Sequence, residues 1–246
     1  ELTEAGRSLY QQSQHMFQNF QMMIDSVRDV NEGFRGLLKI GIIYSNIPVV
    51  MDYLREYHEK YPHVELYVRL GSPKDLLDDL NKGNLHVLFL RNPTEEISQL
   101  HEKILGEDPL ELVMSRELDP APELDTIPIE ALEGVPMCLL RSDDMWGYSS
   151  HLINECQRRG FTPNTVCQCY DTPMAMQMVQ AGFGISYLPR SIVETQPHSD
   201  LYTKPLVGVN ARSYPMLIWS GNIYYANCVM QFISMFQDKK TTGDEG

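Results

Sequence analysis

Residues 37–90, LLKIGIIYSNIPVVMDYLREYHEKYPHVELYVRLGSPKDLLDDLNKGNLHVLFL, decide the fold of this chain. Three runs within them predict strands, because each is rich in aliphatic residues or alternates with polar ones and is bounded by turn signals. These runs cover 37–43, 63–70 and 85–90. The two stretches between them predict helices. Short strand–helix–strand connections imply a parallel sheet with right-handed crossovers, so the first lobe is expected to be α/β.

The clearest helix start is Ser72-Pro73-Lys74-Asp75. Ser72 suits the N-cap, proline suits the first helical position, and the carboxylate of Asp75 meets free amide groups at the positive end of the helix dipole. The preceding helix begins after Ser45 or Asn46, either of which can cap it, and ends before Tyr61-Pro62.

A second series of the same units follows, and it predicts a second α/β lobe. Its strands are expected near 110–115, 136–140, 165–170 and 184–188, and its helices near 149–159 and 173–181. A last strand at 213–220 and a last helix at 223–236 indicate that the chain returns to complete the first lobe. Ligands of such proteins bind where the carboxyl ends of the strands converge, in the cleft between the lobes.

Before the first strand, apolar residues recur at the spacing of a coiled-coil seam. The seam residues are Leu9, Met16, Phe20, Met23, Val27 and Val30. They predict one long helix from residue 7 to about 32, ended by Gly33 and Gly36. A stripe of this kind needs a second helix to cover it, either from a partner chain or by folding back on its own domain.

Composition limits the partners. With a net charge of −13 over 246 residues, the surface should repel the phosphate backbone of DNA. No apolar run reaches the roughly 18 residues of a membrane span, and the first residues lack the features of a signal peptide. We therefore expect a water-soluble, cytoplasmic chain.

The sequence holds five cysteines, Cys138, Cys156, Cys167, Cys169 and Cys228, none in a CxxC spacing. Reduced, mostly buried thiols are the favoured interpretation. Cys167 and Cys169 are two apart in a predicted strand and so share a face, which leaves a redox sensor as a less favoured alternative.

Enzyme chemistry is not indicated. The chain has no GxSxG, HExxH, GxGxxG or Walker motif, and its histidines show no metal-ligand spacing. Asp143 and Asp144 are adjacent, so their side chains point apart and a solvated loop is favoured over an acid–base pair. We expect no enzymatic activity, no metal and no cofactor.

Several segments, in order along the chain, resemble the LysR-type transcriptional regulators. Leu2-Thr3-Glu4-Ala5-Gly6 resembles the end of that family's winged helix-turn-helix domain, and the long helix resembles its linker. Leu38-Lys39-Ile40-Gly41, Tyr61-Pro62-His63-Val64 and Gly83-Asn84-Leu85 match later motifs. The most specific match is 179–189, VQAGFGISYLP.

The resemblance implies a two-lobed, type 2 periplasmic-binding-protein-like fold that senses a small-molecule inducer. It implies a remnant of the DNA-binding domain at 1–6, a dimerisation helix at 7–33, subdomain I at 36–114 plus 209–237, subdomain II at 115–208 and a flexible tail at 238–246. Dimers or tetramers are expected, with promoter DNA contacted only through the family's N-terminal domain. The alternative is a transport-type solute-binding protein of the same fold, which would lack the coiled-coil helix.

Carried over by position, the effector-binding set is Ser45, Asn46, Arg91, Tyr148, Ser149, Asp171 and Thr172. Elementary chemistry supports part of this set, because hydroxyls and free amides at helix starts favour an anion, and an arginine after a strand can clamp a carboxylate. A small carboxylate or a similar polar metabolite is therefore the expected effector. Capping by Ser45 and Thr172, a core position for Tyr148 and a surface ion pair of Arg91 with Glu95 or Glu96 are the structural alternatives.

Two departures from the family pattern bear on the site. Only seven residues separate Gly41 from Pro48, which shortens the first wall of the expected cleft. His86 stands where an aspartate is common, and a lone histidine in a strand is expected to be structural.

Overall fold

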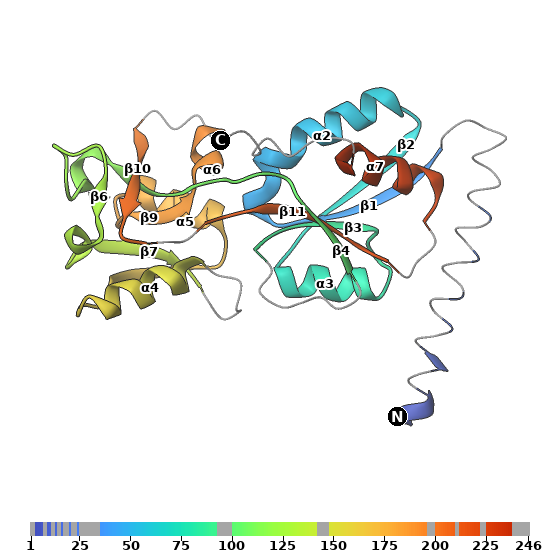
Figure 1. The fold of residues 1–246 in the computed structure, drawn as a ribbon, viewed down its shortest axis with the longest axis horizontal. Coiled ribbons are helices and arrows are strands. Elements are labelled where there is room, and N and C mark those ends of the chain that lie inside the picture. The colour runs from blue at the N-terminus through green and yellow to red at the C-terminus, as the bar shows by residue number, and fades with distance from the viewer. Residues whose placement is uncertain are drawn as a thin grey trace. The chain divides into compact units, whose positions relative to one another are not determined.

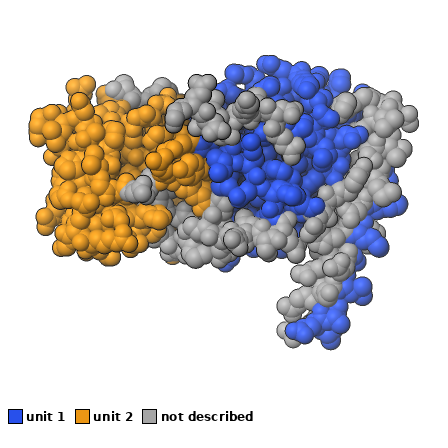
Figure 2. Space-filling model, in the orientation of Figure 1, with its two compact units in different colours: residues 1–90, 95–106, 215–246 blue, residues 91–94, 107–214 orange. Residues whose placement is uncertain are grey.

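The computed structural model describes residues 3–6, 9, 10, 13, 16, 20 and 24, and then 35–92, 100–141, 148–195, 200–209, 212–221 and 225–237. The chain forms two compact units (Figure 2). Unit 1 comprises residues 1–90, 95–106 and 215–246, and unit 2 comprises 91–94 and 107–214.

Unit 1 is built on a five-stranded sheet in the order β2-β1-β3-β11-β4 (Figure 1). Its strands are β1 (Gly36–Ile42), β2 (Val64–Leu70), β3 (Val87–Arg91), β4 (Leu100–Ile104) and β11 (Pro215–Ser220). Its helical elements are η1 (Tyr44–Asn46), α2 (Ile47–Lys60), α3 (Pro73–Asn81) and α7 (Asn227–Gln237). β1 pairs in parallel with both β2 and β3, which confirms the predicted β-α-β-α-β arrangement.

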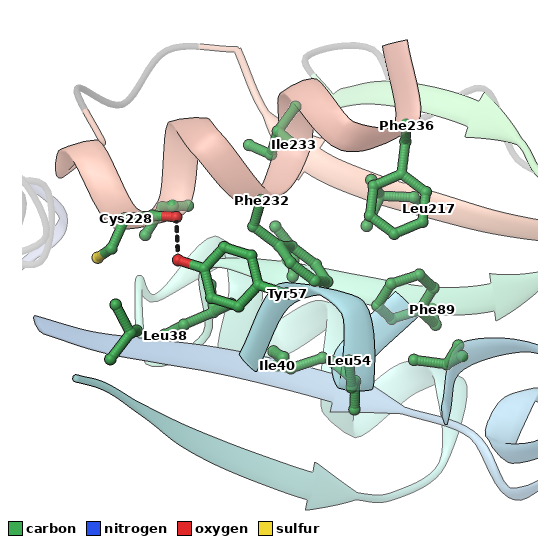
Figure 3. Close-up of a cluster of buried hydrophobic side chains, with 14 of the residues drawn as sticks. Leu38, Ile40, Leu54, Tyr57, Phe89, Leu217, Cys228, Phe232, Ile233 and Phe236 are labelled. Atoms are coloured by element: carbon green, nitrogen blue, oxygen red, sulfur yellow. Dashed lines mark hydrogen bonds between the residues drawn. The ribbon is translucent and has the colours of Figure 1, made fainter. Parts of the chain in front are cut away.

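Helices cover both faces of this sheet (Figure 1). On one face α2 and α7 enclose an aromatic core in which Tyr57 meets Phe232 edge to face, at 5.1 Å between ring centroids (Figure 3). The buried Tyr57 hydroxyl donates a hydrogen bond to the Cys228 carbonyl, at 2.7 Å. On the other face a Cβ at Gly41 would stand only 2.5 Å from a Leu88 methyl. Glycine is therefore required where the side chains under α3 approach β1 most closely.

Unit 2 contains a four-stranded sheet, β6-β10-β5-β9, and a parallel pair, β7-β8. Its strands are β5 (Leu110–Ser115), β6 (Ile127–Pro128), β7 (Pro136–Leu140), β8 (Asn164–Cys169), β9 (Ser186–Pro189) and β10 (Leu201–Val207). Its helical elements are η2 (Arg116–Leu118), η3 (Ile129–Leu132), α4 (Tyr148–Arg158), α5 (Thr172–Gln180) and α6 (Arg190–Glu194).

β7 meets the segment before β9 at Gly184. The Ile185 amide donates to the Pro136 carbonyl at 2.9 Å, and the Cys138 amide donates to the Ile185 carbonyl at 2.8 Å. A Cβ at Gly184 would lie 2.4 Å from the Pro136 carbonyl oxygen. The motif 179–189 therefore needs glycine where two backbones touch, and this contact ties β7 to β9.

The expected subdomain boundaries differ from the units of the structure. The strand Leu110–Ser115, expected to end subdomain I, pairs with β10 and β9 and lies inside unit 2. Residues 209–214, expected in subdomain I, also lie in unit 2. Hydrophobic runs predict the order of the strands and helices. The boundary between the two units depends instead on strand pairing between segments far apart in sequence.

Most of the predicted linker helix, and the tail 238–246, fall outside the described residues. Leu9, Met16 and Phe20 are helical and lie on the predicted seam. They are 71%, 65% and 61% exposed in the single chain. Among the helices that the structure describes, none is long and apolar enough to cross a membrane.

His86 joins β1 to the start of β3. Its Nδ1 accepts a hydrogen bond from the Lys39 amide at 3.1 Å, while its own amide donates to the Lys39 carbonyl at 2.9 Å. Burial, and then the charge of Lys39, lower the pKa of His86 from 6.5 to about 4. The expected structural role of His86 is confirmed, because its neutral imidazole accepts the hydrogen bond of a β1 amide.

Acid should therefore destabilise unit 1 through His86. Between pH 6.5 and 4 the His86 imidazole is protonated in the unfolded chain but remains neutral in the folded chain. The free energy of unfolding therefore falls as the pH is lowered, by about 3 kcal/mol at most. Urea unfolding at several pH values should show this slope, and His86→Asn, which keeps an acceptor, should flatten it. The exposed His63 supplies the control, His63→Asn. Equal slopes for the wild type and His86→Asn would contradict this role.

Candidate functional site

In unit 2, the starts of α4 and α5 lie at one edge of a parallel strand pair. β7 pairs with β8 so that Leu140 lies opposite Cys169 at their carboxyl ends, and the Arg141 amide donates to the Cys169 carbonyl at 2.8 Å. α5 begins at Thr172, three residues after β8, and α4 is the helix that follows β7. The first-turn amides of α4 and the Thr172 amide of α5 therefore lie toward the edge where α/β proteins bind ligands.

α5 starts with a capped turn. Asp171 is its N-cap, and Oδ1 of Asp171 accepts a hydrogen bond from the Met174 amide at 2.9 Å. Thr172 follows as a buried residue, and Pro173 stands in the first turn. Asp171 thus stabilises the helix start, as expected for a cap, and its charge counts against an anion at its own position.

Ser149 is the most unusual polar residue at this edge. Its side chain, in the first turn of α4, is 0% exposed. Its Oγ has no hydrogen-bond partner in the structure. An unsatisfied buried hydroxyl costs about 1–3 kcal/mol, so such a group calls for an explanation. The Tyr148 side chain lies outside the described part of the chain, and its predicted contact with effector stays a prediction.

In unit 1, Ser45 and Asn46 occupy the turn between β1 and α2. Both are buried, and neither gives η1 or α2 a side-chain cap. Asn46 instead donates from Nδ2 to the Leu90 carbonyl at 2.8 Å, so it links the start of α2 to the end of β3. Its Oδ1 is buried without a partner. Asn46 stands at the N-cap position of α2, but the capping role expected of its side chain is wrong, because Nδ2 bonds to the Leu90 carbonyl and Oδ1 accepts no backbone amide of the helix.

Arg91 is the centre of a buried polar network in unit 2. Its side chain pairs with Asp108, with Nη2 2.7 Å from Oδ2, and its Nη1 donates to Ser213 Oγ at 2.8 Å. Asp108 also accepts from the Ser191 amide at 3.1 Å. The residue is 4% exposed. An effector carboxylate would have to displace Asp108, so we interpret Arg91 as structural; effector contact by Arg91 stays a prediction.

This network joins three passages of the chain. Arg91, Asp108 and Ser213 each lie within two residues of a point where the chain passes from one unit to the other. The Asp108 amide donates to the Ser213 carbonyl at 2.8 Å, which adds a backbone link. Sequence patterns do not indicate Asp108, Ser191 or Ser213, because these residues lie 17, 100 and 122 residues from Arg91 along the chain. The surface pairing weighed for Arg91 concerns Glu95 and Glu96, which lie outside the described residues.

The described residues contain no group of three or more histidine, cysteine or acidic side chains arranged to hold a metal ion. At the starts of α2, α4 and α5 their polar groups are hydroxyl, amide and backbone N–H groups, together with the carboxylate of Asp171. Such groups bind small polar molecules by hydrogen bonds rather than by coordination.

Replacing Arg91 tests the structural interpretation. Arg91→Met leaves Asp108 buried without its cation and should lower the free energy of unfolding by about 3–5 kcal/mol. Arg91→Met combined with Asp108→Asn removes the uncompensated charge and should recover part of that loss. Arg55→Met, at an exposed ion pair with Asp52, is the control and should change stability by about 0.5 kcal/mol or less. Urea titration measures the free energy of unfolding of all three variants. A loss below about 1 kcal/mol for Arg91→Met would contradict a structural role for the Arg91–Asp108 pair.

Several solved structures are similar in fold to this chain over most of its length. CbnR, a LysR family transcriptional regulator, gives a TM-score of 0.72 at 18% identity, covering 96% of this chain and 81% of that one. The regulatory domain of Synechocystis PCC6803 CcmR, solved in complex with 2-PG, gives 0.73 at 16% identity, covering 86% and 100%. The BenM effector-binding domain with its effector benzoate gives 0.67 at 17% identity, covering 82% and 90%. The fold is thus the two-lobed, type 2 periplasmic-binding-protein-like fold of regulator effector domains.

Sequence comparison specifies the family. Residues 31–240 match the model of the LysR substrate binding domain, and the chain belongs to that family. It is 23% identical over 239 residues to the HTH-type transcriptional regulator BsdA of Bacillus subtilis, covering 96% of this chain and 80% of BsdA. It is 27% identical over 195 residues to the regulator AlsR of the same species, covering 78% and 63%. These relatives are named as transcriptional regulators, not as enzymes or transport proteins, in agreement with the resemblance found in the sequence.

Proposed function

We propose that this domain binds a small polar effector, a carboxylate in the first instance, at the starts of α4 and α5, and that binding controls transcription by the regulator to which it belongs. The observation that carries the proposal is the Ser149 hydroxyl, fully buried and without a partner at the first turn of α4. A bound molecule would supply the missing hydrogen bond. LysR-type regulators bind small-molecule effectors and DNA, which agrees with this role.

The carboxylate follows from the groups present. Backbone amides at helix starts carry partial positive charge, so they favour an anion within hydrogen-bonding distance. Ser149 and Thr172 add hydroxyls that donate as well as accept. Because Arg91 is neutralised by Asp108, the anion would be held by amides and hydroxyls rather than by an arginine. Benzoate, the effector of the matched BenM domain, is a carboxylate, and it supports the same class of ligand here.

Unit 1 offers a complementary group. Oδ1 of Asn46 is an acceptor without a partner, and it requires a donor such as a hydroxyl or N–H. With the neighbouring Ser45 it forms the unit 1 part of the proposed effector set.

Ser149→Ala separates ligand binding from folding. Removal of an unsatisfied buried hydroxyl should leave the stability of the free domain unchanged or raise it, whereas loss of its bond to effector should weaken affinity about tenfold. A thermal-shift screen of small carboxylates, each paired with its neutral amide, identifies the ligand, because binding to the folded state raises the melting temperature. Calorimetry then measures affinity for the wild type and the variant.

Thr165→Val supplies the matched control, since Thr165 is an exposed hydroxyl residue in β8. Affinity should not change in this variant. Unchanged affinity in Ser149→Ala would show that the effector does not bind at the start of α4. Tighter binding of the neutral amide compounds than of the matching carboxylates would show that the effector is not an anion.

The exposed seam supports self-association through the linker. Leu9, Met16 and Phe20 share one face of a helical segment and are open to solvent in the single chain. We propose that the same segment of a second copy covers them in a dimer, the building block of a tetramer, and that promoter DNA is bound by a domain preceding this segment in a cytoplasmic regulator.

A charge on the seam should prevent this pairing. Phe20→Glu is expected to raise the dimer dissociation constant by about tenfold or more, because a carboxylate would be buried in an apolar interface. Light scattering across a concentration series measures the change. The exposed Tyr67, in β2, provides the control variant Tyr67→Glu; an identical dissociation constant for Phe20→Glu and the wild type would place the interface elsewhere.

A further inference from the structure

Three thiols gather on one face of the β7-β8 pair in unit 2. Cys138 lies opposite Cys167, and Leu140 lies opposite Cys169. The Sγ atoms of Cys167 and Cys169 are 3.6 Å apart. Cys167 also acts on Cys138, whose pKa it helps to raise. Cys167 is thus the central thiol, in contact with both of the others.

A bulge produces this alignment. Met137 lies opposite Thr165, and Cys138 lies opposite Cys167, so Val166 is an extra residue of β8 without a partner in β7. Without the bulge, Val166 would lie opposite Cys138, and Cys138 would be on the other face of the pair from Cys167 and Cys169. Bulges are retained features that re-aim side chains, and this one brings three sulfurs together.

The three thiols differ in access. Cys138 and Cys169 are buried in the cluster under α5, beside Ala175 and Met176, whereas Cys167 lies at its edge and is partly exposed. Burial raises the pKa of both Cys138 and Cys169 to about 12. These two remain protonated near neutral pH, so they can donate S–H hydrogen bonds to Cys167, and they are poor first nucleophiles. Cys167 is the thiol that a small oxidant reaches.

We propose that Cys167 and Cys169 form a redox-active dithiol. The Cys167 thiolate attacks the terminal oxygen of a hydroperoxide; the O–O bond breaks, Cys167 becomes a sulfenic acid, and the other oxygen leaves as hydroxide or alkoxide. The leaving group takes up the proton that Cys167 released on ionising, which gives water or an alcohol. The Cys169 sulfur then attacks the Cys167 sulfur, its proton goes to the departing hydroxide, and a disulfide and water form. In total two thiols lose two electrons and two protons, and the peroxide is reduced by the same two electrons.

The geometry makes the disulfide reversible. A disulfide bond is about 2.05 Å long, so sulfurs now 3.6 Å apart must approach by about 1.5 Å. Alternate residues of a strand are about 6.6 Å apart along it, whereas the Cβ atoms of a disulfide are only about 3.5–4.5 Å apart, so the backbone at Gln168 must bend to close the bond. A bond that strains its strand is easily reduced, which is a property of regulatory rather than structural disulfides.

Closure should act on the start of α5. Cys169 is the last residue of β8, and Asp171, the cap of α5, follows two residues later. A bend at Gln168 displaces the strand end that positions this cap and Thr172. The redox chemistry stands independently of the proposed effector site, and only a consequence for effector affinity rests on that site.

Peptide mapping tests the dithiol. Trypsin cuts after Arg116, Arg141, Arg159 and Arg190, so Cys167 and Cys169 share the peptide 160–190 while Cys138 is in 117–141. The purified domain is treated with hydrogen peroxide, its free thiols are alkylated and the protein is digested. The proposal requires that peptide 160–190 lose the mass of two hydrogen atoms, carry no alkyl group on either cysteine, and regain both thiols with dithiothreitol.

Three results would overturn the assignment: both thiols alkylated as in the untreated protein, irreversible conversion of Cys167 to a sulfinic acid, or a cross-link between 117–141 and 160–190. Cys167→Ser should abolish the mass change. Cys156→Ser, which removes a buried thiol of unit 2 outside the trio, should leave it intact.

Amide hydrogen exchange tests the coupling to α5. In the oxidised wild type, exchange in the first turn of α5 should quicken by about fivefold or more, equivalent to about 1 kcal/mol. Oxidised Cys167→Ser should show no change. A disulfide that forms without altered exchange in α5 would contradict the coupling, and it would leave the separate test of the effector site by Ser149→Ala unaffected.

Discussion

The parallel pairing of β7 with β8 is the constraint on which the functional part of unit 2 depends. Parallel neighbours end at the same edge, and the pair runs from Pro136 opposite Asn164 to Leu140 opposite Cys169. Both helices that follow these strands must then start at that edge, with free amides directed outward. The same ladder determines which residues face α5. The proposed effector groups lie at the end of the pair and the thiols lie on its face, so one register sets both.

Unit 1 reaches a similar result with different residues. The buried amide of Asn46 ties the start of α2 to the end of β3, and Gly41 lets the side chains beneath α3 approach the sheet. In both units a polar side chain at a helix start is buried beside the end of a strand and keeps an atom without a partner, Asn46 Oδ1 in one and Ser149 Oγ in the other. Buried groups of this kind destabilise a free domain, so their presence at the ligand-binding edge of α/β sheets supports a role in binding.

The sequence predicted the features that depend on neighbouring residues. Ser72 was expected to cap α3, and its Oγ accepts from the Asp75 amide at 3.2 Å. The strands and helices around β1, β2 and β3 were expected from their patterns and lie within a few residues of those positions. The motif 179–189 also identified the family, and the structure supplies a physical reason for one of its glycines in the contact of Gly184 with β7.

Features that depend on distant partners were not predictable. Asn46 has the side chain of a helix cap, yet its acceptor is the Leu90 carbonyl, 44 residues along the chain. Arg91 follows a strand as a ligand-binding arginine would, but Asp108 and Ser213 occupy its guanidinium. No pattern local to Leu110–Ser115 shows that it pairs with β9 and β10. The bulge at Val166 places Cys138 opposite Cys167 and so adds a third thiol to the face that Cys167 and Cys169 share, which hydrophobic periodicity does not reveal.

The central claim is that effector binds the amides and hydroxyls at the starts of α4 and α5. Residue-resolved amide exchange with and without a saturating effector tests it most directly, because a ligand that accepts hydrogen bonds from backbone N–H groups slows their exchange. We predict strong protection in the first turn of α4 and at the Thr172 amide of α5, and none at the Met174 amide of α5 or the Asp75 amide of α3, which Asp171 and Ser72 already satisfy. Protection that leaves α4 and α5 unchanged would contradict the account.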